Sequence, residues 1–119
     1  MEAHNDLLIF MACYNMRLSL MNKARIYAGA AFQLAPNDLR AREIHGYILL
    51  LDGELDRCEA VVTSGGPSSN LSYLRARLSL LRGQVAQAGQ HLRDYLALRA
   101  AESAAEGGKG TGDAGGAAA

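Results

Sequence analysis

The residues best able to do chemistry gather in one short stretch of the chain. Three acids, Asp52, Glu54 and Asp56, alternate around Gly53, and a thiol follows at Cys58. Paired carboxylates can act as general acid and base, and a cysteine can have a redox or disulfide role. Side chains at i, i+2 and i+4 around a turn do not converge on one cleft, however. We therefore interpret the stretch as a solvent-facing turn, with Cys58 on the inner face of the helix that follows.

The other candidates for chemistry are three histidines and a pair of glycines. His4, His45 and His91 lie far apart, and neither they nor the two cysteines have the spacing of metal ligands. His45 falls where two helices are expected to cross, which favours packing over ligation or base catalysis. Gly65-Gly66 lacks the Lys and Ser or Thr of a phosphate-binding loop. The sequence predicts no catalytic residue, no metal site and no cofactor.

Length and charge restrict the class of protein. The 119 residues suit one domain, and twelve basic residues balance twelve acidic ones without a basic block, which argues against a nucleic-acid surface. Cys13 and Cys58 form no CxxC pair and are interpreted as buried thiols of a reducing compartment. The N-terminus is acidic and its apolar run is short, so we expect neither a signal peptide nor a membrane span. A cytoplasmic protein is the prediction.

The elements that would position these residues are six helices, because apolar residues keep helical spacing and no segment alternates with period two. The expected helices cover residues 7–20, 23–35, 39–51, 54–63, 71–81 and 84–102. Short polar residues precede several of them as expected caps, namely Asn5, Asp6, Asn37, Asp38 and Asn70. Beyond residue 102 the chain is mostly Ala and Gly, so we predict a helical domain over 1–102 and a disordered tail over 103–119.

The first of these helices is apolar almost all round. An outer helix of a small domain normally keeps a polar face. Only Asn15, Arg17 and Ser19 interrupt the apolar residues of the segment 7–20. This composition predicts that the helix is covered on both sides, partly by another protein chain.

Three turns in the chain look alike. Leucines precede Gly53 and Gly83, and Ser19 takes the corresponding place in a looser third copy. A small residue follows each turn, and these residues lie 34 and then 30 positions apart: Ala24, Cys58 and Ala88. Intervals near 34 are typical of a repeated helical hairpin.

The pattern resembles the tetratricopeptide repeat, a 34-residue hairpin with small residues at the helix crossing and a proline near its end. The matching residues are Ala24, Ala31 and Pro36 in the first repeat, Gly46, Gly53 and Cys58 in the second, and Ala76, Gly83, Ala88 and Tyr95 in the third. Arg42 stands at a position that is usually aromatic, and the second repeat lacks its proline. The resemblance implies an all-α fold of three tandem hairpins, an α-solenoid with a right-handed superhelix.

Residues 6–99 also resemble the small type III secretion chaperones of the YscY (SctY) family. The likeness rests on the first hairpin with its Leu-Ala-Pro junction and Arg-rich continuation, and on the last hairpin, Leu80 to Leu98. It implies a bacterial cytoplasmic chaperone that binds one small, helical, amphipathic export substrate, YscX-like, as a heterodimer or small heterocomplex. The YscG-like co-chaperone of the needle subunit is a second possibility. A general tetratricopeptide adaptor for protein partners is the third.

The resemblance also implies a binding surface, because the first helices of tetratricopeptide hairpins line the concave side of the stack. The residues expected there are Ile9, Cys13, Met16, Glu43, Tyr47, Leu50, Tyr73, Arg77 and Leu80. The groove would be mostly apolar and suited to an amphipathic helix. Leu50 and Leu80 fit a place in the core equally well.

Overall fold

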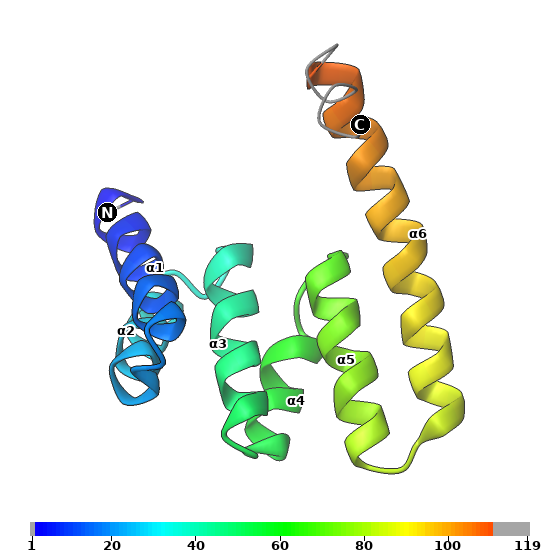
Figure 1. The fold of residues 1–119 in the computed structure, drawn as a ribbon, viewed down its shortest axis with the longest axis horizontal. Helices are drawn as coiled ribbons and strands as arrows, with labels where there is room; N and C mark the ends of the chain where they lie inside the picture. Colours follow the sequence, from blue (N-terminus) through cyan, green and yellow to red (C-terminus); the bar gives the residue numbers. More distant parts are fainter. Residues whose placement is uncertain (1, 111–119) are drawn as a thin grey trace.

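Six α-helices make up residues 2–110, the part of the chain that the computed structural model describes. They are α1 (Glu2–Arg17), α2 (Met21–Leu34), α3 (Leu39–Leu51), α4 (Leu55–Thr63), α5 (Ser69–Leu81) and α6 (Val85–Gly110). Figure 1 shows α1, α3 and α5 descending and α6 rising, in sequence order from left to right. Residues 2–110 contain no strand, so the all-α prediction is confirmed. No helix in this range is long and apolar enough to cross a bilayer.

The turns after α1, α3 and α5 share one backbone geometry. Each has a single residue in the left-handed region, Ser19 at φ 64°, Gly53 at 78° and Gly83 at 76°. In each, the following amide donates to a carbonyl five positions earlier, over 2.8, 3.0 and 2.8 Å. That bond satisfies a carbonyl left free at the end of a helix. The predicted equivalence of the three turns is confirmed, with Ser19 at a position where glycine has no steric cost.

The start of α1 differs from the prediction. The helix begins at Glu2, so Asn5 and Asp6 lie inside it and do not cap it. Asn5 is buried, and its amide donates to Asp38 Oδ2 over 2.7 Å. Asp38 itself caps α3 as predicted, because its carboxylate accepts from the Arg40 amide. Asn5 therefore joins the start of α1 to the start of α3.

Two further helix boundaries, the start of α5 and the end of α6, differ from the prediction. The cap of α5 is Ser68, whose hydroxyl accepts from the Leu71 amide; Asn70 lies inside the helix. The helix α6 continues to Gly110, eight residues beyond the predicted end of the helical domain at residue 102. The rest of the predicted tail, 111–119, lies outside the described residues. Glu102 belongs to the helix and accepts hydrogen bonds from the amide and hydroxyl of Ser69, at the start of α5.

The core has two parts. The first, between α3, α4 and α5, consists of Leu49, Leu50, Cys58, Val61, Val62, Leu71, Leu74 and Leu78. The second, between α1, α2 and α3, consists of Ala12, Ala24, Ala28, Ile44 and Ile48. The helix α3 contributes to both and therefore links them. At Gly46 it approaches α4 so closely that a Cβ atom would lie 2.8 Å from Val62 Cγ1.

The C-terminus of α4 is held by two arginines. This helix has only nine residues. The Arg42 guanidinium donates to the carbonyl of Val61 over 2.7 Å, and that of Arg75 donates to the carbonyl of Val62 over 2.5 Å. Cations favour the negative end of a helix dipole and satisfy its free carbonyls. Arg42, which stands where the repeat usually has an aromatic residue, thus fixes α4 against α3.

Candidate protein-binding groove

A mostly apolar concavity lies between the first helices of the three pairs, α1, α3 and α5. Its volume is about 410 Å³. The lining residues are Ile9, Cys13, Arg40, Glu43, Ile44, Tyr47, Asn70, Tyr73 and Leu74. Most of them are apolar or aromatic, and the polar ones, Arg40, Glu43 and Asn70, come from the first turns of α3 and α5. We call this concavity the groove.

Five of the nine residues expected at a concave surface line the groove. They are Ile9, Cys13, Glu43, Tyr47 and Tyr73. Tyr47 has a double role, because it also packs against the core between α3, α4 and α5. Tyr73 is 41% exposed and is therefore more accessible to a partner.

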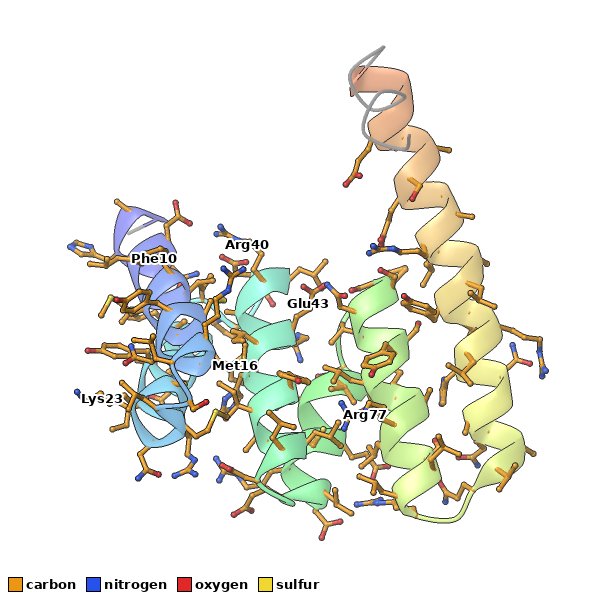
Figure 2. The ribbon with its side chains drawn as sticks, in the orientation of Figure 1. Phe10, Met16, Lys23, Arg40, Glu43 and Arg77 are labelled. Atoms are coloured by element: carbon orange, nitrogen blue, oxygen red, sulfur yellow. The ribbon has the colours of Figure 1, made fainter. Side chains whose placement is uncertain are left out.

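The other four lie elsewhere. Leu50 is only 4% exposed and belongs to the core. Met16 packs against the core between α1, α2 and α3, and Figure 2 shows it on the side of α1 that faces α3. Leu80 is 54% exposed and does not line the groove. Arg77 lies beside the groove, with its guanidinium carbon 5.7 Å from the centre of the Tyr73 ring.

Four lining residues escaped the sequence-based count: Arg40, Ile44, Asn70 and Leu74. They could have been predicted by taking every residue on one face of each helix. On α3 the groove residues are 40, 43, 44 and 47, and on α5 they are 70, 73 and 74 with Arg77 next in the series. These positions follow the i, i+3, i+4, i+7 spacing of one side of a helix. The positions that the expected repeat assigns to the concave surface include only part of that face.

Ion pairs and hydrogen bonds hold the polar end of the groove in place. Arg40 donates to Asp6 over 2.6 Å and to Asp38 over 3.0 Å, which ties α1 to α3. The bonds from Arg40 lower the pKa of the Asp38 carboxyl below its usual value. Glu43 accepts from the Ser68 hydroxyl over 2.5 Å and from the Asn70 amide over 3.1 Å, which ties α3 to α5.

The acidic turn around Gly53 has a structural role. Asp52 accepts from Arg25 of α2 over 2.5 Å, and Asp56 accepts from Arg82 at the end of α5 over 2.5 Å. The two carboxylates thus pair with arginines on different helices and do not share a site. Residues 52, 54 and 56 are exposed, in line with the predicted solvent-facing turn, and the prediction that the acids do not converge is confirmed.

His45 and Cys58 are packing residues, as predicted. His45 is buried and stacks on Phe32 with ring centres 5.0 Å apart. Its burial, and then the charge of Arg57, lower the pKa of the imidazole. Cys58 is fully buried and its Sγ donates to the Gly46 carbonyl over 3.4 Å. Burial raises the pKa of the Cys58 thiol, which keeps it protonated and weakly nucleophilic.

Within residues 2–110, no three His, Cys, Asp or Glu side chains lie together as a metal site requires. No protein-family model, curated protein or solved structure matches this chain. The geometry of the groove offers contact area for another apolar surface.

Proposed function

We propose that this chain is a type III secretion chaperone that holds a small export substrate in the groove. The observation that carries the proposal is the apolar concavity of about 410 Å³ between α1, α3 and α5. A groove with apolar walls and a few fixed polar groups suits the apolar face of an amphipathic helix, anchored at i, i+3, i+4 and i+7. Tyr47 and Tyr73 provide large contact areas with polar tips, as interface cores commonly do.

The proposed architecture is a stack of three tetratricopeptide hairpins in a right-handed superhelix. Helices pack in the pairs α1 with α2, α3 with α4, and α5 with α6. The equivalent small residues Ala24, Cys58 and Ala88 are 0, 0 and 2% exposed, in keeping with positions where paired helices cross. The common geometry at Ser19, Gly53 and Gly83 adds support. In such a stack the first helices form the concave side, which is where the groove lies.

The resemblance to the YscY (SctY) family points to a YscX-like client in the bacterial cytoplasm. The test is co-production with small secretion substrates encoded beside this chain, followed by purification and titration calorimetry. We expect one of them to form a stable complex. Binding of unrelated peptides instead would favour a general adaptor, and a needle subunit as client would favour the YscG-like role.

A variant pair locates the binding surface. Tyr73→Glu places a charge without a partner in the groove and is expected to weaken client binding by at least about tenfold. Leu80→Glu, at a similarly exposed residue of the same helix outside the groove, is the matched control and is expected to bind normally. Tyr73 serves better than Tyr47, because Tyr47 also packs against the core. Equal binding by both variants would contradict a client seated in the groove.

A further inference from the structure

A second apolar surface runs along the outer side of α1, away from the groove. Leu7, Phe10, Tyr14 and Leu18 are 57, 61, 50 and 52% exposed. At about 100° per residue, positions 7, 10 and 14 fall within roughly 60° of one another on the helix surface, and Leu18 follows directly after the end of α1 at Arg17. Phe10 and Tyr14 stack with ring centres 5.9 Å apart. Figure 2 shows Phe10 on the side of α1 that faces away from α3. We call these four residues the α1 stripe.

The helices of residues 2–110 leave the α1 stripe uncovered. Within residues 2–110, α1 contacts only α2 and α3, and the stripe stays exposed in their presence. The remaining C-terminal residues, 111–119, are Thr, Gly, Asp and Ala only. They contain no large apolar side chain that could pair with leucines and aromatic rings. We therefore consider a separate polypeptide as the partner of this surface.

The order of residues along the α1 stripe makes it complementary to a second copy of itself. It has a leucine at each end and an aromatic ring at each of the two inner positions. If two copies of α1 pack antiparallel about a two-fold axis level with Ala12 and Cys13, Leu7 meets Leu18 of the other copy and Phe10 meets Tyr14. Isologous contacts of this kind, in which i meets j and j meets i, are what two-fold symmetry requires.

The charges beside the α1 stripe fit the same arrangement. Asp6 and Arg17 are separated by eleven positions, which places them within about 20° of each other on one flank of the helix. In an antiparallel two-fold pair this flank faces its own counterpart, so Asp6 of each copy lies opposite Arg17 of the other. The Asp6 side chain is 58% exposed even though it pairs with Arg40. In a parallel two-fold pair this flank would face the opposite flank of the other copy, so Asp6 and Arg17 would not meet.

We propose that the α1 stripe is a self-association surface through which two copies of this chain pair antiparallel. With roughly 200 Å² for a fully exposed large side chain, four half-exposed residues offer about 400 Å² per copy. A standard stable interface needs about 800 Å² per partner. The area of the proposed interface is therefore about half the standard, and we expect a weak dimer. The four residues of the α1 stripe do not line the groove, although the Asp6 flank adjoins it through the ion pair with Arg40.

Sedimentation equilibrium from about 10 µM to 1 mM measures this association. We expect a monomer–dimer equilibrium that Phe10→Glu weakens by at least about tenfold. Leu96→Glu, on α6 and with a nearly equal exposure of 64% against 61%, is the matched control and should leave the dimer unchanged. Circular dichroism checks that each variant keeps its helix content. A wild-type chain that stays monomeric over the whole range overturns the proposal.

Disulfide cross-linking tests the antiparallel direction. In a Cys13→Ser background, where Cys58 is buried, Leu7→Cys and Leu18→Cys are oxidised separately and as a mixture. Cross-linking in the mixture, and little in either variant alone, supports the arrangement. Cross-linking of each variant with itself would mean a parallel pair and overturn it. If Phe10→Glu weakens only client binding, while the chain alone is monomeric, the stripe serves the client instead.

Discussion

The helices α1 and α3 are similar in composition but opposite in what they bury. The helix α3 buries the apolar residues Ile44, Ile48, Leu49 and Leu50. The helix α1 buries Asn5, Ala12 and Asn15, while its larger apolar residues of the α1 stripe remain exposed. A helix with neighbours on two sides can bury its large side chains, whereas an end helix buries only the strip that faces inward. The comparison teaches that apolar content alone does not identify the buried face.

The largest expected difference in the free energy of unfolding is between truncating a large side chain on α3 and truncating one on α1. Leu49→Ala removes a side chain that is 1% exposed, and we expect the free energy of unfolding to fall by about 2–5 kcal/mol. Phe10→Ala, at a residue 61% exposed, should change it by less than about 0.5 kcal/mol. Urea denaturation at low protein concentration measures both values. Comparable losses would mean that α1 is packed as tightly as α3.

Close packing of α3 gives the next prediction. A methyl group at Gly46 would meet Val62 Cγ1 at 2.8 Å, so Gly46→Ala should lower the free energy of unfolding by about 1–3 kcal/mol. The control is Gly66→Ala, because a Cβ atom at Gly66 has no neighbour within 4 Å. The same urea titration applies. If Gly46→Ala behaves like the control, α3 and α4 have room to separate.

The turns that follow α1 and α3 give a third prediction, because both hold a residue in the left-handed backbone region. Gly53→Ala places a side chain at φ 78° and should cost about 1 kcal/mol. Ser19→Gly relieves the same strain at φ 64°, and we expect a gain below about 1 kcal/mol because glycine also loosens the unfolded chain. Thermal unfolding of the two variants should shift the midpoint in opposite directions. Shifts of the same sign would contradict the equivalence of the turns.

The smallest effect concerns pH, since it involves one titrating group over a narrow range. The pKa of His45 in the folded chain lies below the ordinary value of 6.5, so the unfolded chain binds the proton more tightly. The free energy of unfolding should therefore fall as pH drops below about 6.5. His45→Leu should flatten this dependence between pH 7.5 and 5.5, measured by urea titration. The buried polar residues of α1, Asn5 and Asn15, do not titrate and cannot produce it.

Sequence patterns predicted the helices well because apolar spacing and turn residues are local signals. The range expected for α3, 39–51, matches the structure, and Ser19 has the backbone conformation of the two turn glycines. The burial of Asn5 was not predictable, since it depends on Asp38, which lies 33 residues away in the chain. The groove was predictable in part. Its tyrosines stood at concave positions of the expected repeat, and Arg40 and Asn70 share the helical faces of Tyr47 and Tyr73.

The pattern of helix contacts has a consequence for unfolding. Within residues 2–110 every helix packs only against helices one or two places along the chain. Such a chain behaves almost as a one-dimensional array, in which each pair is stabilised by its neighbours and the ends open first. Amide hydrogen exchange should therefore be slowest in α3, which alone joins both parts of the core, and faster toward either terminus. With contacts so local in sequence, refolding should also be fast.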